Sequence, residues 1–128
     1  MTALTAAARK KRILVVEDEP DSGDLLALAL GTEYDVEVAR DGVEGVERAA
    51  AWEPDLVITD VNMPRLSGLE MVRHLRRRQG LKAPVIFVTS LGAPSDIIAG
   101  ISVGARHYLT KPVELDDLRE KVARALGQ

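Results

Sequence analysis

Leu56-Val57-Ile58-Thr59-Asp60 is a short β-branched run that ends in an acid, and the turn Asn62-Met63-Pro64 follows it. A run of this length and composition is typical of a buried strand, and the acid and the turn end it. Ile13-Leu14-Val15-Val16 repeats the pattern and leads into Glu17-Asp18-Glu19-Pro20, which cannot continue a buried strand. The chain therefore predicts strands whose carboxyl ends carry polar side chains.

A helix with an apolar face is predicted after each strand. These helices begin near Pro20, Asp41, Ser67, Pro94 and Leu115. Besides the two runs above, strands are expected at Val36 to Ala39, at Val85 to Val88 and around Tyr108 and Leu109. Several strands are apolar throughout, as a parallel sheet covered on both faces requires. The predicted fold class is α/β: a doubly wound, five-stranded parallel sheet with helices on both faces.

Composition narrows the class of protein. No apolar run approaches the ~20 residues that span a bilayer. The basic residues Arg9 to Arg12 follow the small-residue run Met1 to Ala8, the wrong order for a secretory signal. We therefore expect a cytoplasmic protein without membrane association, with a disordered basic tail at residues 1–11 and one domain at residues 12–128. The absence of cysteine excludes disulfides and thiolate metal sites.

Charge argues against direct binding of nucleic acid. The net charge of −3 offers duplex DNA no overall attraction. The basic run Arg73 to Arg78 lies at a predicted helix C-terminus, which attracts cations in any case, and it has no interleaved aromatic residues. We interpret this run as a solvated helix face.

Acidic side chains gather at one predicted edge of the sheet. In doubly wound sheets the ligand site lies beyond the carboxyl ends of the strands. The polar residues expected there are Glu17, Asp18, Asp60, Thr89 and Lys111. Two unit charges ~4 Å apart repel by roughly 4 kcal/mol at an effective dielectric constant of ~20. Because Glu17 and Asp18 are expected at an exposed rim, a hard divalent cation is a better answer to this repulsion than a raised pKa.

Mg²⁺ suits a site of carboxylates, a backbone carbonyl and waters that keeps positions open for phosphate oxygens. Asp60 is then available as a carboxylate nucleophile toward a phosphoryl group. Lys111 can pair with phosphoryl oxygens, and Thr89 can donate a hydrogen bond to another. In-line transfer of a phosphoryl group depends chiefly on positioning the reacting atoms and neutralising the charge of the phosphoryl oxygens.

These residues, in this order, resemble the receiver domain family of two-component response regulators. The likeness extends from Arg12 to the C-terminus, and each segment alone is weak whereas four in register are specific. The matching segments are Ile13-Leu14-Val15-Val16-Glu17-Asp18-Glu19, Thr59-Asp60-Val61-Asn62-Met63-Pro64, Val88-Thr89-Ser90 and Tyr108-Leu109-Thr110-Lys111-Pro112. The resemblance implies a flavodoxin-like receiver fold that accepts a phosphoryl group from a sensor histidine kinase or a phosphotransfer protein.

The resemblance also implies roles for single residues. Asp60 is the phospho-acceptor, Glu17 and Asp18 hold Mg²⁺ directly or through water, and the backbone carbonyl of Asn62 is a further ligand. Thr89 and Lys111 form the phosphoryl-sensing pair.

Lys111-Pro112 is expected to be cis, and Tyr108 is the aromatic switch that follows Thr89 inward. The surface of the fourth helix, fifth strand and fifth helix is expected to meet a downstream output domain or protein, and homodimerisation through the fourth and fifth helices is left open.

Three positions depart from the family pattern. Glu17 stands where Asp is commoner, which favours a water-bridged metal contact. Ser90 stands where Ala is usual. Leu91 places an apolar group where the family controls the access of water to the phosphoryl group, and we hypothesise that it slows loss of that group.

The residues allow three alternative functions to be compared with this one. A haloacid dehalogenase-type hydrolase wants a second acid two residues after the nucleophile, where this chain has Asn62. A nucleotide-binding Rossmann module needs a glycine-rich loop after the first strand, where this chain has Glu17-Asp18-Glu19-Pro20. A receiver fold that serves only as a docking module, without phosphorylation, is the remaining alternative.

Overall fold

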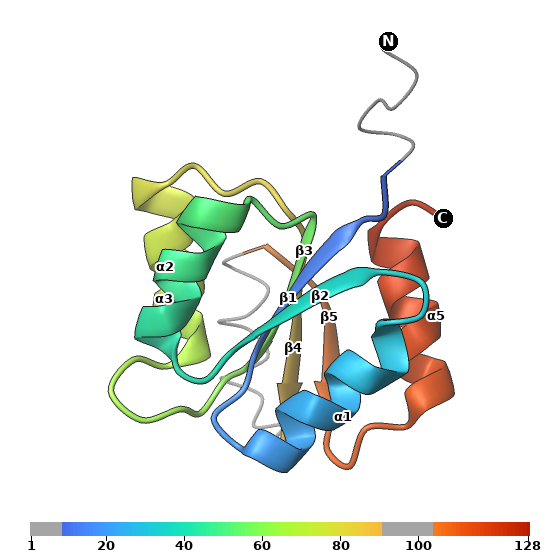
Figure 1. Cartoon of the computed structure of the whole chain (residues 1–128). Helices are drawn as coiled ribbons and strands as arrows, with labels where there is room; N and C mark the ends of the chain where they lie inside the picture. The colour runs from blue at the N-terminus through green and yellow to red at the C-terminus, as the bar shows by residue number, and fades with distance from the viewer. Residues whose placement is uncertain (1–8, 91–103) are drawn as a thin grey trace, which may run out of the picture.

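A five-stranded parallel sheet forms the centre of the protein (Figure 1). The computed structural model describes residues 9–90 and 104–128. The sheet order is β2-β1-β3-β4-β5, with each neighbouring pair parallel. The strands are β1 (Arg12–Val16), β2 (Asp35–Ala39), β3 (Leu56–Asp60), β4 (Val85–Thr89) and β5 (Ala105–Thr110). The predicted doubly wound parallel sheet is thus confirmed.

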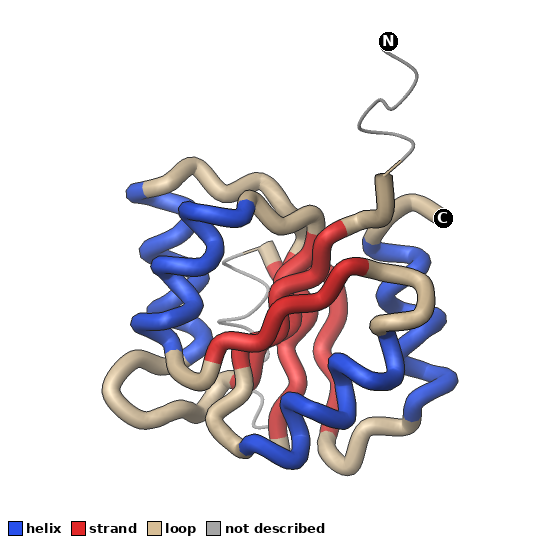
Figure 2. The backbone as a smooth tube through the Cα atoms, viewed as in Figure 1, coloured by secondary structure: helices blue, strands red, loops and turns tan. Residues whose placement is uncertain are grey.

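Helices cover both faces of the sheet (Figure 2). On one face, α1 (Pro20–Leu30) and α5 (Leu115–Ala125) pack against the sheet, and on the other α2 (Gly42–Trp52) and α3 (Gly68–Arg78) do so. The helix predicted from Pro94 falls, apart from its expected end at Gly104, outside the described residues.

The two helical layers explain why the strands read as continuous apolar runs. In β1, Ile13 and Val15 belong to the core under α1 and α5, whereas Leu14 and Val16 belong to the core under α2 and α3. Every residue of β3 and β4 is buried. Strands inside a parallel sheet must be apolar on both faces, because neither face meets water.

The helix ends follow the caps that the sequence predicts. The Asp41 side chain accepts a hydrogen bond from the Glu44 N–H at 2.8 Å, and Ser67 Oγ accepts one from the Glu70 N–H at 3.2 Å. Pro20 lies in the first turn of α1, where the missing N–H costs no helical hydrogen bond. These caps fix where α1, α2 and α3 leave the edge of the sheet that carries the site.

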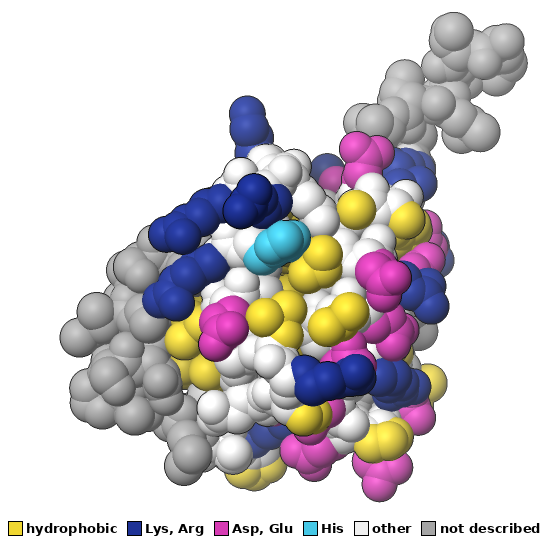
Figure 3. All heavy atoms as spheres, turned by 90° about the vertical axis from the view of Figure 1, so that its left-hand side faces the viewer, with side chains coloured by type: hydrophobic (Ala, Val, Ile, Leu, Met, Phe, Trp, Pro, Cys, Tyr) yellow, Lys and Arg dark blue, Asp and Glu magenta, His cyan; other side chains and the backbone are white. Residues whose placement is uncertain are grey.

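The basic residues of α3 contribute to a surface on which Lys and Arg side chains gather (Figure 3). Arg77 and Arg78 are exposed. Arg76 donates hydrogen bonds to the carbonyl oxygens of Leu81 and Ala83 at 2.9 and 2.8 Å, and so holds the chain after the helix. These positions fit the interpretation of a solvated helix C-terminus. Within the described part of the chain, no helix has the length and apolar character needed to cross a membrane.

Candidate functional site

Four strands end at the same edge of the sheet and bring polar side chains together there. The parallel register aligns Val16 with Thr59, and Asp60 with Val88. Glu17 follows β1, Asp60 ends β3, Thr89 ends β4 and Lys111 comes one residue after β5. The carboxyl ends of parallel strands share one edge, so residues far apart in the chain become neighbours.

Lys111 is the centre of the site. Its Nζ lies 2.8 Å from Asp60 Oδ2, 2.9 Å from Glu17 Oε2 and 3.4 Å from Glu19 Oε1. Burial by itself lowers the pKa of Lys111, but the hydrogen bonds and negative charges of Asp60 and Glu17 outweigh it and raise the pKa above its ordinary value. Lys111 therefore remains a cation at any physiological pH.

Glu17 is buried, with only 1 % of its surface exposed. The expectation of an exposed Glu17 at the rim is therefore wrong, and the reason is the close approach of α1. A Cβ added at Gly23 would lie 3.5 Å from the Cβ of Glu17, so this glycine lets the helix cover the acid. Glu17 Oε1 accepts a hydrogen bond from the Glu19 N–H at 3.2 Å. Burial raises the pKa of Glu17, against the lowering effect of its hydrogen bond from Lys111.

Asp60 is held in a defined orientation. Oδ1 accepts a hydrogen bond from the Asn62 N–H at 3.0 Å, and Oδ2 accepts one from Lys111. The start of α3 lies directly against the Asp60 backbone, because a Cβ at Gly68 would collide with the Asp60 carbonyl oxygen. The Gly68 N–H donates to the Val61 carbonyl oxygen at 2.8 Å. Asp60, the predicted phospho-acceptor, therefore lies at a tightly packed turn.

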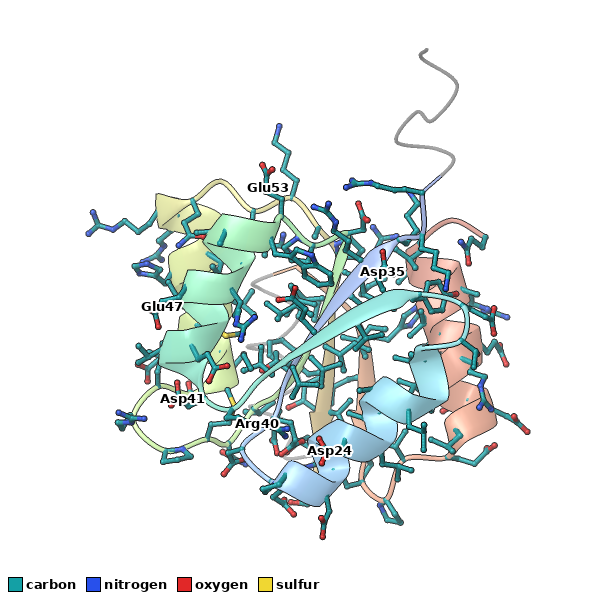
Figure 4. The ribbon with its side chains drawn as sticks, viewed as in Figure 1. Asp24, Asp35, Arg40, Asp41, Glu47 and Glu53 are labelled. Carbon is teal, nitrogen blue, oxygen red and sulfur yellow. The ribbon has the colours of Figure 1, made fainter. Side chains whose placement is uncertain are left out.

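The loop after β3 is also tied to α2. Arg65, whose φ is 69°, places its guanidinium 2.6 Å from Asp41 Oδ2. The hydrogen bond from the Glu44 N–H, with the neighbouring Arg65 charge, holds the pKa of Asp41 below its ordinary value. Figure 4 shows Asp41 at the site end of α2. Asp41 therefore links the start of α2 to the loop that carries Asn62.

Glu19 is a site residue to which sequence reasoning gave no role. Carboxylate oxygens of Glu17, Glu19 and Asp60 lie within 4.8 Å of one another, close enough to hold one metal ion. Asp18 is partly exposed and does not belong to this group of three. The signal in the sequence was the third acid in Glu17-Asp18-Glu19, but only the turn geometry shows that the side chain returns to Lys111. The metal-binding role of Asp18 stays a prediction.

Thr89 and Tyr108 lie on the neighbouring strands β4 and β5. Thr89 is buried, and its carbonyl oxygen accepts a hydrogen bond from the Lys111 N–H at 2.8 Å. Tyr108 pairs with Phe87 in the sheet register, with ring centroids 5.8 Å apart. The Lys111-Pro112 peptide bond is cis, as the resemblance implied. The switch roles of Thr89 and Tyr108 stay predictions, and Leu91 lies outside the described residues.

An apolar cleft of about 450 Å³ opens beside Lys111. Leu25 of α1 and Pro112 after β5 line it, together with Ser90. Leu25 is 51 % exposed, and Leu28, one helical turn further along, is 77 % exposed. The site therefore has a charged centre with an apolar surface next to it.

The chemistry of the site fits a hard cation. Glu17, Glu19 and Asp60 offer carboxylate oxygens as ligands, and the Lys111 ammonium sets one positive charge against these three carboxylates. Magnesium prefers carboxylate, carbonyl and water oxygens. The observed donor set therefore suits Mg²⁺, with Lys111 able to remain alongside as a second cation.

Comparison with known proteins identifies the family to which this chain is similar. Residues 13–123 match the Response regulator receiver domain family. The chain is 43% identical over 116 residues to the response regulator protein PmrA of Pseudomonas aeruginosa, covering 90% of this chain and 52% of that protein. It is 44% identical over 118 residues to the transcriptional regulatory protein TcrA of Mycobacterium tuberculosis, covering 91% of this chain and 46% of that protein. It spans about half the length of the curated relatives it matches.

Solved structures of related proteins have the same fold as this chain. The chemotaxis protein CheY4 of Vibrio cholerae superposes with a TM-score of 0.87 at 31% identity, covering 92% of this chain and 100% of that one. A receiver domain protein from Methanospirillum hungatei gives a TM-score of 0.86 at 30% identity, over 93% of this chain and 95% of that one. The chain therefore belongs to the response regulator receiver domain family of two-component signalling, a family of signalling modules rather than conventional enzymes.

Proposed function

We propose that this receiver domain accepts a phosphoryl group on Asp60 from a sensor histidine kinase or a phosphotransfer protein, in a reaction that needs Mg²⁺. The observation that carries the proposal is the Lys111 ammonium, which pairs with Asp60 at 2.8 Å and with buried Glu17 at 2.9 Å. A lysine with three N–H donors, held beside an oriented carboxylate, is suited to bind the oxygens of a phosphoryl group.

The transfer is a displacement at phosphorus. A carboxylate oxygen of Asp60 forms a bond to phosphorus while the bond from phosphorus to the imidazole nitrogen of a phosphohistidine breaks. The electron pair of that bond stays on the nitrogen, and Asp60 becomes an acyl phosphate. Lys111 and Thr89 would donate hydrogen bonds to the phosphoryl oxygens, which orients the group and offsets its charge.

Glu17, Asp18, Asp60 and the backbone carbonyl of Asn62 would hold Mg²⁺. When bound, the ion supplies positive charge against the carboxylates and the phosphoryl oxygens. The burial of Glu17 supports its part in this set, since a buried carboxylate gains most from a neighbouring cation.

Phosphorylation is proposed to change the shape of the domain. Thr89 would move toward the phosphoryl group and Tyr108 would follow, which alters the surface of the predicted fourth helix, β5 and α5. This surface would meet an output domain or a downstream protein. Homodimerisation through the fourth and fifth helices remains an open part of the proposal.

The proposal includes the setting of the domain. The family match over residues 13–123 and the start of β1 at Arg12 support a tail at residues 1–11 and a receiver domain at residues 12–128. We propose a cytoplasmic location, in line with the sequence, and no direct binding of nucleic acid by this domain.

Phosphorylation can be tested directly with a small phosphodonor. Incubation with acetyl phosphate and Mg²⁺ is expected to add the mass of one phosphoryl group, and Asp60→Asn is expected to abolish the increment. If neither acetyl phosphate nor a cognate kinase labels the unaltered protein, the docking-module alternative is favoured. Hydrolysis of a phosphate monoester over many turnovers, a substrate that is a far poorer phosphodonor than acetyl phosphate, would instead favour a hydrolase.

A further inference from the structure

Lys111 has as many carboxylate partners as it has N–H donors. An ammonium group carries three N–H bonds. The Nζ of Lys111 lies 2.8 Å from a carboxylate oxygen of Asp60, 2.9 Å from one of Glu17 and 3.4 Å from one of Glu19. A phosphoryl group that accepts a hydrogen bond from Lys111 therefore competes with these carboxylates for its N–H donors.

The three carboxylates are not held equally. The side chain of Glu17 is 1 % exposed and receives a second hydrogen bond from the Glu19 N–H. Asp60 is 8 % exposed in its side chain and is itself the proposed acceptor. The Glu19 side chain is 65 % exposed and makes the longest of the three contacts, at 3.4 Å. Glu19 is therefore the least firmly held of the three carboxylates.

Glu19 also places a negative charge at the mouth of the site. Its carboxylate is mostly in water, so moving it away from Lys111 costs little. While it is paired with Lys111, it occupies the place of a phosphoryl oxygen and repels an anion that approaches from solvent. Both effects oppose small anionic phosphodonors.

We infer that Glu19 competes with the incoming phosphoryl group for Lys111, and so determines how readily this receiver reacts with small anionic phosphodonors. The inference rests on the proposed phosphorylation of Asp60. It assigns to Glu19 a role distinct from metal binding, because a competitor hinders phosphoryl binding whereas a metal ligand assists it.

The test compares Glu19→Gln with the unaltered protein at saturating Mg²⁺. Beryllofluoride affinity is measured by calorimetry, and the rate of phosphorylation by acetyl phosphate is measured by mass. Both are expected to rise about two- to fivefold, the size expected for one partly exposed ion pair. Asp21→Asn is the matched control, because Asp21 is an exposed acid of α1 that is not among the carboxylates paired with Lys111.

Asp21 is preferred to Asp24 as the control. Asp24 pairs with Arg40 at 2.9 Å, and the two side chains face each other (Figure 4). A Cβ added at Gly23 would lie 3.0 Å from the Arg40 guanidinium and 3.5 Å from the Cβ of Glu17, so this pair is close to the site. Removal of Asp24 would free a cation near the phosphodonor. Asp21→Asn changes the net charge as Glu19→Gln does, and we expect it to leave both readings unchanged.

Each remaining outcome overturns the inference. Equal gains in Glu19→Gln and Asp21→Asn would show a general effect of charge. Unchanged or lower beryllofluoride affinity in Glu19→Gln at saturating Mg²⁺, with circular dichroism showing a folded protein, would show that Glu19 assists the site as a ligand or does nothing. Failure of the unaltered protein to be phosphorylated would instead remove the proposed function itself.

Discussion

Glu17 combines two solutions to the crowding of negative charge. Lys111 pairs with it at 2.9 Å, yet burial still raises its pKa above the ordinary value. A raised pKa means that the folded protein disfavours the charged form of this acid. The charged form of Glu17 therefore carries an electrostatic free-energy cost in the folded protein, which a bound cation would reduce.

The pH dependence of the free energy of unfolding should reveal this cost at Glu17. Because the pKa of Glu17 is higher in the folded state than its ordinary value of 4.5, its contribution to stability is complete below pH 4.5 and is lost as the pH rises through the folded-state pKa. Glu17→Gln cannot ionise. In the absence of Mg²⁺, we expect the free energy of unfolding of Glu17→Gln, relative to the unaltered protein, to be higher at pH 7 than at pH 4.5.

Urea unfolding of both proteins at the two pH values gives this difference, in which acids that do not interact with Glu17 cancel. Added Mg²⁺ should stabilise the unaltered protein more than Glu17→Gln, since binding to the folded state adds to stability by mass action. A relative stability that is the same at both pH values would show that Glu17 does not titrate differently on folding.

The helix α1 contributes to the site in two ways. Through Gly23 it covers Glu17, and through Leu25 it lines the apolar cleft beside Lys111. Leu28 continues the same helix face and is 77 % exposed. An exposed apolar helix face beside the proposed phosphoryl site is suited to pack against a protein phosphodonor.

Leu28→Ser should separate protein donors from small donors. We expect phosphotransfer from a cognate histidine kinase to fall about fivefold or more, the effect of losing an interface contact of ~1 kcal/mol. Phosphorylation by acetyl phosphate should not change, and the midpoint of urea unfolding should fall only slightly, because Leu28 is mostly in water already and Ser has only a somewhat lower helix propensity than Leu.

Val43→Ser is the matched control for Leu28→Ser. Val43 is 47 % exposed and lies on α2, which packs on the other face of the sheet. Equal kinase transfer in Leu28→Ser and the unaltered protein would place the donor elsewhere on the surface.

At the scale of the whole molecule, the candidate site lies at one edge of the five-stranded sheet. β4 and β5 pair in regular register from Ile86 to Thr89, after a register shift between Val85 and Ile86, with Thr89 aligned to Thr110 and Phe87 to Tyr108. A movement of Thr89 therefore directly affects the neighbouring edge strand β5. The proposed switch depends on this contact between the two strands.

Beryllofluoride with Mg²⁺ should alter amide hydrogen exchange in β5 (Ala105–Thr110) and leave β2 (Asp35–Ala39) unchanged. The reason is that β5 adjoins β4 and Lys111, whereas β2 is the far edge of the sheet. Asp60→Asn should remove the response. Exchange rates in β5 that stay the same while calorimetry shows binding would rule out the proposed switch through Tyr108.

The sequence by itself determined the fold class and the main partners in the site. Apolar runs that end in Glu17, Asp60 and Thr89 predict a parallel sheet, and parallel strands bring their carboxyl ends to one edge whatever the loops do. The pairing of Asp60 with Lys111, 51 positions apart, follows from that topology. These predictions depend on patterns that are local in the chain.

Only the tertiary structure decided how the acids divide their roles. Glu17 is buried because α1 approaches the sheet closely at Gly23, and Glu19 reaches Lys111 because the turn after β1 directs it back over the site. Solvent exposure and the contacts of a flexible acid depend on what other elements place around it, which residue type and spacing do not encode. The burial of Glu17 and the part of Glu19 were therefore absent from the sequence prediction.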